Sequence, residues 1–327
     1  MSFLSSFSSF KKRVKAHCPV ILWSALRILK SYVVKMVFFL KTVKAYFNSE
    51  PKTFKYRLAI TAIIKNEGRY IEEWIKYHVI VGVEKFYLYD NESTDNTKKI
   101  LEPYVKCGLV DFIYFPGEAK QHPAYIDALK RYKNECEFMA VIDGDEFIRP
   151  MDKNKNIYDI IKEIMLNTKV KRVVGIVVPW KNFGSSGYVK TPLTGGVLGN
   201  FTHRQTDEDA LIRNNAGKTI CNPRKVITFV NPHFPYTAKF LNVINENGDI
   251  VPDAASRVIP HKICIHHYFT KSKEEYIERR SIGKADSCHN DLNHFRTLDE
   301  FYARDFNDVY DDSMLYYVEK IKDLKLF

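Results

Sequence analysis

The chain of 327 residues has few cysteines, and they follow no recognisable pattern. Its six cysteines include no CxxC pair and no spacing typical of a zinc site, so neither a disulfide framework nor a zinc fold organises the chain. We interpret them as buried or incidental thiols of a protein in a reducing compartment.

Acidic residues are almost missing from the first 57 positions. This segment holds 12 Lys and Arg residues and one acid, Glu50, whereas the remainder holds 38 basic and 38 acidic residues. The net charge of +11 therefore comes from the N-terminal segment alone. Because a nucleic-acid binder usually carries its basic patch on the folded domain, this distribution argues against a nucleic-acid partner.

The N-terminal segment also lacks a long uninterrupted apolar run. Basic residues break residues 19–47 before any run reaches the roughly 20 apolar residues of a spanning helix. A small-residue cleavage site is missing too, so we expect no signal peptide. On a helical wheel Arg27, Lys30, Lys41 and Lys44 gather on one face. The opposite face is apolar, with Ile28, Leu29, Tyr32, Met36, Phe39, Leu40, Val43 and Phe47.

Such an amphipathic helix is typical of a segment that lies in an anionic membrane surface. A helix packed on the protein's own core or on a partner is the alternative. We treat residues 1–56 as a basic amphipathic segment, with a linker over 48–56, that precedes the folded domain.

The rest of the chain alternates between buried-strand patterns and helical spacing. We expect strands at 58–64, 85–90, 109–115 and 138–142, with helices at 69–81, 95–105 and 123–134 between them. Asp95 is the expected N-cap of the second helix. This alternation predicts an α/β fold with a mostly parallel central sheet covered on both faces.

Polar clusters follow three of these strands, and ligands of such sheets bind beyond the carboxyl ends of the strands. The clusters are Asn66 with Glu67, Asp90 with Asn91, and Asp143 with Asp145. Gly144 lets the backbone bend so that both flanking aspartates can face one point. Carboxylate oxygens favour Mg²⁺, Mn²⁺ or Ca²⁺, so a metal that also holds a diphosphate is expected here. A solvated acidic turn is the alternative reading of this triplet.

Several motifs carry a resemblance to known transferases. "YDNESTDNT" (89–97) resembles the "DDGSTDGT" element of family 2-type GT-A glycosyltransferases, and "VIDGDEF" (141–147) resembles their DxD motif. "WKNFGSSG" (180–187), "KTICNP" (218–223) and "HHYFTKSKEEYIERRSIGKA" (266–285) resemble the DUF23 or glycosyltransferase family 92 group and its bacterial relatives. The resemblance covers roughly residues 58–285.

This resemblance implies a GT-A fold, which is a Rossmann-like nucleotide-diphospho-sugar transferase. It also implies a UDP-linked sugar donor, Mn²⁺ or Mg²⁺, and inverting transfer to a hydroxyl of a cell-surface glycan such as lipopolysaccharide or capsule. By motif position, Asp90 and Asn91 approach the nucleotide, although family 2 proteins usually have aspartate where Asn91 stands. Asp143 and Asp145 hold the metal, and His267 matches the late histidine that GT-A enzymes commonly add to it.

Two further roles are expected near the donor. Ser272-x-x-Glu275 is a capping box that starts a helix after His267, so Lys271, the helix N-terminus and Lys284 can face phosphates. The general base is expected at Asp209 of "TDEDA", because family 2-type enzymes often use the last acid of an "ED" pair. Other candidates stay open at this point: Asp207, Glu208, Asp253 and His233.

The resemblance divides the folded part into a nucleotide-sugar half (57–180), an acceptor and catalytic half (181–285) and a C-terminal helical extension (286–327). We expect the protein in the cytoplasm, held peripherally at the inner face of the plasma membrane.

Two other classes of protein are alternatives to a glycosyltransferase: another metal-dependent enzyme acting at a phosphate, and a non-enzymatic interaction protein. A phosphatase of the HAD type needs Thr four residues after its nucleophilic Asp, where Phe147 stands, and a nucleotidyltransferase needs a Gly-rich basic loop that "KNEGRY" does not match. An inactive transferase fold acting as a membrane-associated interaction protein is the remaining alternative.

Overall fold

The computed structural model describes residues 20–47, 50–213, 216–280, 283, 287, 288, 291 and 295–327. The chain divides into two compact units, Met1–Asn48 and Ser49–Phe327. The boundaries expected at residues 180 and 285 fall inside the second unit and stay a prediction.

The first unit contains helix α2 (Val20–Phe47), so the predicted N-terminal helix is present. Basic residues recur along it, and the described part of the chain holds no helix with the length and apolarity needed to cross a membrane.

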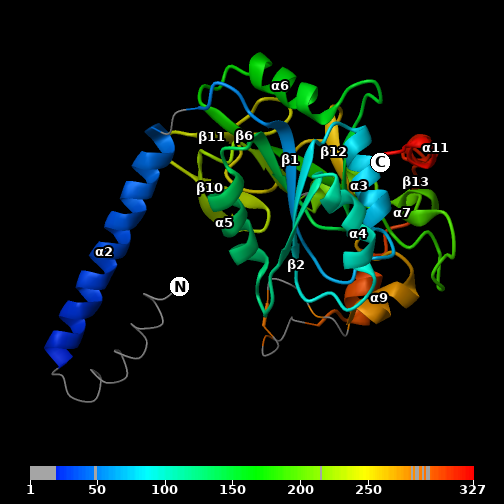
Figure 1. Ribbon diagram of the computed structural model, residues 1–327, viewed down its shortest axis with the longest axis horizontal. Helices are drawn as coiled ribbons and strands as arrows, with labels where there is room; N and C mark the ends of the chain where they lie inside the picture. Colours follow the sequence, from blue (N-terminus) through cyan, green and yellow to red (C-terminus); the bar gives the residue numbers. More distant parts are fainter. Residues whose placement is uncertain are drawn as a thin grey trace. The chain divides into compact units, whose positions relative to one another are not determined.

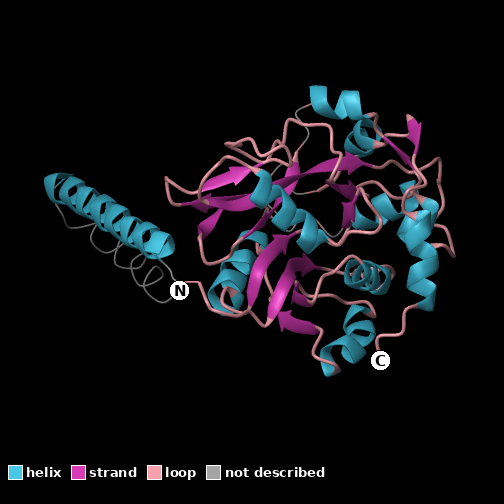
Figure 2. Ribbon diagram, turned by 90° about the horizontal axis from the view of Figure 1, so that it is seen from above, coloured by secondary structure: helices cyan, strands magenta, loops and turns pink. Residues whose placement is uncertain are grey.

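The second unit alternates strands and helices over its first half, as the sequence predicts (Figures 1 and 2). Its strands are β1 (Tyr56–Ile64), β2 (Lys85–Asp90), β3 (Val110–Tyr114), β4 (Cys136–Val141), β5 (Glu146–Pro150), β6 (Val173–Asn182), β7 (His203–Arg204), β8 (Gly217–Cys221), β9 (Val226–Asn231), β10 (Phe234–Thr237), β11 (Asn242–Ile244), β12 (Ile263–His267) and β13 (Val309–Tyr310). Its helices are α3 (Ile71–Ile80), α4 (Thr97–Lys106), α5 (Gln121–Tyr132), α6 (Ile157–Asn167), α7 (Gly196–Asn200), α8 (Asp207–Ile212), α9 (Lys273–Arg280), α10 (Leu298–Arg304) and α11 (Leu315–Asp323).

Nine of the described strands form a mixed sheet in the order β3-β2-β1-β4-β8-β6-β12-β5, with β11 beside β6, and two further sheets have two strands each, β9 with β10 and β7 with β13. Strands β3, β2, β1 and β4 are parallel, and β6 and β12 are parallel. Strand β8 is antiparallel to both β4 and β6, and β5 is antiparallel to β12. The predicted α/β class with a mostly parallel central sheet is confirmed, and the longest parallel block lies at the N-terminal side of the sheet.

Alternate side chains of β1 face opposite layers of the core, as the two-residue period of a strand requires. Leu58, Ile60 and Ala62 pack in the larger cluster with α3, α4 and α6. Ala59 and Ile63 pack in a second cluster with α5 and β9. Figure 1 shows α5 on one side of β1 and β2, and α3 and α4 on the other. Both faces of the parallel block are therefore buried, which explains its continuous apolar strands.

The helices predicted at 69–81, 95–105 and 123–134 correspond to α3, α4 and α5, whose ends lie within two residues of those predicted. Gly82 follows α3 with a φ of 98°, a conformation that stops a helix at little cost for glycine. The N-cap of α4 is Asn96 rather than Asp95. The Asp95 carboxylate accepts hydrogen bonds from the backbone N–H groups of Thr97 and Gly68, at 3.0 and 2.9 Å. It ties the start of α4 to the loop after β1.

Candidate functional site

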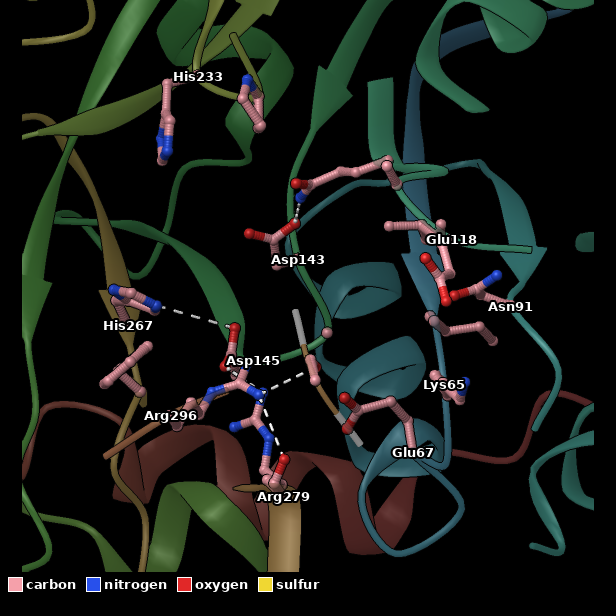
Figure 3. Close-up of a pocket in the computed structure, with 18 of the residues that line it drawn as sticks. Lys65, Glu67, Asn91, Glu118, Asp143, Asp145, His233, His267, Arg279 and Arg296 are labelled. Carbon is pink, nitrogen blue, oxygen red and sulfur yellow. Dashed lines mark hydrogen bonds and ion pairs between the residues drawn. The ribbon is translucent and has the colours of Figure 1, made fainter. Parts of the chain in front are cut away.

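A cavity of about 490 Å³ opens where β1, β2 and β4 end (Figure 3). The register pairs Ile64 of β1 with Asp90 of β2, so the loops after these strands lie side by side. Among the predicted site residues, those that line the cavity are Glu67, Asn91, Asp143, Asp145 and His267. His233, one of the candidates left open for the base, lines it too. The structure therefore brings both aspartates of "VIDGDEF" and the late histidine to one place.

Asp143 is held by three side chains that the sequence did not single out. Lys218 of β8 donates to its Oδ2 at 2.8 Å, and Gln121 and Tyr125 of α5 donate to its Oδ1 at 2.9 and 3.2 Å. Burial alone would raise the pKa of Asp143, but the Lys218 ammonium lowers it below its ordinary value. Asp143 is thus a fixed carboxylate.

Gly144 allows the turn between the aspartates to approach Glu67. A Cβ atom added at Gly144 would lie 3.3 Å from the Glu67 side chain, which is tighter than ordinary contact. The predicted need for glycine at this position has a steric reason in addition to the bend.

Asp145 is almost buried and forms an ion pair with Arg279 of α9. The guanidinium lies 3.0 Å from Oδ2, and Figure 3 shows both side chains meeting at the cavity wall. Burial alone would raise the pKa of Asp145, whereas Arg279 and then His267 lower it well below its ordinary value. The capping box predicted at the start of α9 is confirmed, because Ser272 Oγ and Glu275 bond reciprocally. The box fixes the helix that delivers Arg279.

The third carboxyl of the motif, Glu146, lies beneath the loop. It is fully buried, and its Oε2 accepts the backbone N–H of Asp143 at 2.8 Å. Burial raises its pKa well above the ordinary value, against the opposing effect of Lys218. Through its hydrogen bond to the Asp143 N–H, Glu146 braces the loop from within the core.

His267 faces Asp145 from the last position of β12. Its Nε2 lies 3.8 Å from Asp145 Oδ1, and its Nδ1 lies 3.2 Å from Asn182 Oδ1. Its ring packs on Trp180, with centroids 4.3 Å apart. The preceding residue, His266, is fully buried and packs on Phe183 instead. Only one of the two histidines reaches the cavity, as the alternation of a strand requires.

The pair of Asp145 and His267 fits a divalent cation. An amide oxygen can only accept, so Nδ1 carries the proton that is donated to Asn182, and Nε2 presents a lone pair to Asp145. Burial lowers the pKa of His267 to about 4, so the ring is neutral at pH 7. Two acceptors therefore face each other with no proton between them, and imidazole and carboxylate are both ligands of Mn²⁺. Within the described part of the chain, no group of three or more ligating side chains is already gathered.

Four predicted site residues are not among those that line the cavity. Asn66 Oδ1 accepts the backbone N–H of Thr94 at 2.7 Å, so it braces two loops. Asp90 is buried and accepts from the Ser93 N–H. Neither side chain lines the cavity, but both hold the loops that form it through hydrogen bonds to their backbone.

Lys271 and Asp209 also lie away from their expected positions. Lys271 is buried over the ring of Tyr70, 4.6 Å from its centroid, so it does not extend into the cavity. Asp209, on α8, accepts hydrogen bonds from Gln205 and Arg213, which lie on either side of the helix. Lys284, also considered for phosphate contact, lies outside the described residues.

Asn91 lines the cavity, but its side-chain N–H groups donate to backbone oxygens of the protein. Its Nδ2 donates to the backbone oxygens of Phe115 and Gly117, at 3.1 and 2.8 Å. This bonding positions the loop after β3, which also lines the cavity. Asparagine suits this place because aspartate has no N–H to donate.

Cationic residues of the site were missed by sequence reasoning. Arg279, Arg296 and Arg304 line the cavity from the C-terminal part of the chain. Lys218 and Arg279 occur inside "KTICNP" and "HHYFTKSKEEYIERRSIGKA", so the motifs located them without indicating their roles. Arg296 and Arg304 lie beyond the motifs and had no signal in the sequence.

The chain is similar to curated plant proteins. It is 27% identical over 145 residues to a glycosyltransferase family 92 protein of Ricinus communis, which covers 44% of this chain and 26% of the relative. It is 25% identical over 202 residues to one of Oryza sativa subsp. japonica, covering 60% and 33%. The chain thus spans about a quarter to a third of the length of these relatives.

Solved structures give weaker similarities. Staphylococcus aureus TarS 1–349 in complex with UDP matches with 16% identity and a TM-score of 0.34, covering 51% of this chain and 47% of that chain. Glucosyl-3-phosphoglycerate synthase from Mycobacterium tuberculosis in complex with Mn²⁺, UDP and glucosyl-3-phosphoglycerate matches with 15% identity and a TM-score of 0.26, covering 41% and 50%.

The family model supplies the assignment. The model of glycosyltransferase family 92 matches residues 64–250, a span that begins at the last residue of β1 and includes β2, β4 and the loop with Asp143 and Asp145. The family resemblance expected from the motifs is confirmed, and this chain belongs to glycosyltransferase family 92.

Proposed function

We propose that this protein is a metal-dependent, inverting glycosyltransferase that moves a sugar from a nucleotide-sugar donor to a hydroxyl of a glycan. The observation that carries the proposal is the pair of unprotonated acceptors, Asp145 Oδ1 and His267 Nε2, facing each other 3.8 Å apart. The pair lies at the strand ends of an α/β sheet, where nucleotides bind in this class of fold.

Asp145 and His267 would hold Mn²⁺ or Mg²⁺, with Asp143 beside them on the same turn. A metal in this place supplies charge stabilisation for the departing nucleoside diphosphate. Arg296 and Arg304 line the same cavity and can contribute positive charge toward the phosphates. Asp143, fixed by Lys218, would orient the ribose or a metal-bound phosphate.

The donor nucleotide, which we propose is UDP, would lie along the loops after β1, β2 and β3. Glu67 and Asn91 belong to the cavity wall on this side, with Glu118 near them (Figure 3). The sugar would then point toward Trp180 and His267 on the opposite wall.

The acceptor would enter from a second cavity of about 370 Å³ that shares Trp180, Phe269 and Arg304 with the first. Aromatic and apolar walls with a few polar groups are typical of small-molecule sites. A cell-surface glycan presenting one hydroxyl across these shared residues would meet the donor sugar. An inverting transfer needs a base within reach of that hydroxyl.

We propose Glu300 as this base in place of Asp209. Glu300 lines the donor cavity and belongs to α10, which also carries Arg304 of the shared wall. Tyr276 donates to its Oε2 at 3.3 Å, which orients the carboxylate.

We also propose that α2 holds the enzyme peripherally at the cytoplasmic face of the plasma membrane. Within its own unit the helix exposes bulky apolar side chains, such as Tyr32 and Phe39, together with lysines. Anionic headgroups attract such lysines while the apolar face enters the interface.

The experiment is donor hydrolysis by the full chain with a panel of nucleotide sugars, with and without Mn²⁺. We expect Mn²⁺-dependent release of nucleoside diphosphate from at least one UDP-sugar. Release that is unaffected by chelation, or no release or binding from any donor, would contradict the proposal.

A further inference from the structure

We propose that Asn182, Gln205 and Asp209 form a hydrogen-bonded chain that holds His267 in the tautomer able to bind metal. The chain runs from the Asp209 carboxylate through two side-chain amides to His267 Nδ1. These three are positioning residues, because none of them is needed as a ligand. The inference rests on the proposed function for its purpose, but the tautomer itself is a property of the metal-free protein.

The backbone brings these residues together independently of their side chains. Strands β12 and β6 are parallel, and their register pairs His267 with Asn182. The Gln205 N–H then donates to the Asn182 carbonyl oxygen at 2.9 Å. Thr206 caps α8 by accepting the Asp209 N–H, which places Asp209 one turn from Gln205.

The direction of every hydrogen bond in the chain follows from the charge at its outer end. A carboxylate only accepts, so Gln205 must turn its Nε2 toward Asp209. Its Oε1 then faces Asn182 and accepts from Nδ2 at 3.1 Å. The Asn182 Oδ1 is left to face His267, where it accepts from Nδ1 at 3.2 Å.

The outcome at the inner end is a histidine whose Nε2 lone pair points at Asp145. Without an acceptor at Nδ1, the proton could move to Nε2 and bond to the Asp145 carboxylate directly. That tautomer would place a proton where the metal has to bind. The hydrogen-bonded chain therefore favours the tautomer whose Nε2 can bind metal over the tautomer whose Nε2–H would bond to Asp145.

Arg213 keeps the outer end charged. Its guanidinium Nε lies 3.0 and 2.9 Å from the two oxygens of Asp209. Gln205 and Arg213 both lower the pKa of Asp209. The acidic "TDEDA" stretch thus acts at a distance from the cavity, through Gln205 and Asn182.

Loss of a group that orients a metal-bound histidine typically costs 10- to 100-fold in metal affinity. Asn182→Leu removes the acceptor at Nδ1, so we expect its Mn²⁺ affinity to fall by about this factor. Asn182→Asp keeps an acceptor at Nδ1 and should restore most of the affinity. Asn200→Leu is the matched control, since this half-buried asparagine bonds only to the loop at Thr194 and Gly196 within the described residues.

The test uses the full chain and two readouts. Histidine labelled with ¹⁵N reports the tautomer of His267 in the metal-free protein, assigned by comparison with His267→Gln. Mn²⁺ titration followed by electron paramagnetic resonance, with UDP present, reports affinity without turnover. We expect the Nδ1–H tautomer in the wild type, Asn182→Asp and Asn200→Leu, and a shift toward Nε2–H with weaker Mn²⁺ binding in Asn182→Leu.

The outcomes separate the two proposals. If the wild type binds Mn²⁺, and Asn182→Leu keeps both the Nδ1–H tautomer of His267 and the Mn²⁺ affinity, the proposed role of the hydrogen-bonded chain is refuted while the metal site stands. If the wild type does not bind Mn²⁺, both the proposed metal dependence and the proposed role of the hydrogen-bonded chain are contradicted. An equal loss of affinity in Asn200→Leu would assign the effect to general destabilisation and overturn the inference.

Discussion

Replacing Asp145 by Asn should weaken both catalysis and folding. The substitution keeps the shape of the side chain but removes the charge that faces Arg279 at 3.0 Å. From sequence alone, relief of repulsion between neighbouring carboxylates predicts equal or higher stability. The structure reverses this expectation, because Asp143 is already paired with Lys218 and Asp145 with Arg279.

The magnitude follows from the exposure of the pair. Breaking a buried ion pair costs about 3–5 kcal/mol and an exposed one about 0–1 kcal/mol. The Asp145 side chain is 7% exposed and that of Arg279 is 21% exposed, so we expect an intermediate loss of about 2 kcal/mol. For the unit Ser49–Phe327 that loss corresponds to a fall of about 3 °C in Tm, because the entropy of unfolding is about 2.1 cal/mol/K per residue. Transfer should fall about a hundredfold or more, since a catalytic metal contributes several kcal/mol.

The pH dependence of this stability has a definite sign. The folded pKa of Asp145 lies below its unfolded value, because Arg279 and His267 outweigh burial. The ion pair therefore stabilises the wild type above the unfolded pKa of about 3.9, and this contribution is lost as pH falls below it. Asp145→Asn should lack this component of acid unfolding.

The assay is thermal unfolding of metal-free protein for Asp145→Asn, Arg279→Gln and the double variant, with Glu146→Gln as control. The double variant should lose less stability than the sum of the single variants, because each single variant leaves one charge unpaired whereas the double variant leaves none. Glu146→Gln should be mild, since glutamine keeps a side-chain oxygen that can accept the Asp143 N–H. Unchanged or raised Tm in Asp145→Asn, or strict additivity, would refute the reasoning about the pair.

Three further predictions concern other parts of the chain. Burial lowers the pKa of His78 to about 3, so the neutral histidine stabilises the fold above its unfolded pKa of about 6.5. This stabilisation should be lost as pH falls from about 6.5 toward about 3. The stability of His78→Gln, measured over the same pH range, should not show this loss. Glu300→Gln should reduce the rate of transfer by about a hundredfold or more, as expected for a general base. Asp209→Asn should reduce it by less than about tenfold. Steady-state rates of the two variants with the same donor show which carboxylate acts as the base. Deletion of residues 1–48 should leave a folded core, because unit Ser49–Phe327 contains its own sheet and core; binding to anionic vesicles, measured by co-sedimentation, should be lost, and unfolding of the truncated chain or vesicle binding that persists would contradict the proposed anchor.

The sequence predicts the parallel half of the fold well because its signals are local. Strands such as 85–90 are continuous apolar runs bounded by polar clusters, and β2 occupies these residues in the structure. The second half depends on pairing between distant segments. Strand β8 lies between β4 and β6 because of long-range register, which no local period encodes.

The site shows the same division. Asp143, Asp145 and His267 could be predicted because they belong to motifs that follow strands. The partner of Asp143 could not, since Lys218 is 75 residues away along the chain and reaches it only through the β4–β8 pairing. The sequence predicts Asp209 as the base because an acidic pair does not reveal that Gln205 and Arg213 already bind its carboxylate.

The central claim is that Asp145 and His267 bind a divalent metal that in turn binds the donor diphosphate. Calorimetric titration of UDP into the full chain, with Mn²⁺ and after chelation, tests it most directly. We predict UDP binding that requires Mn²⁺ in the wild type and is weakened at least tenfold in His267→Ala, with His266→Ala affected less. UDP binding that is equal with and without Mn²⁺, or equal in the wild type and His267→Ala, would contradict the account.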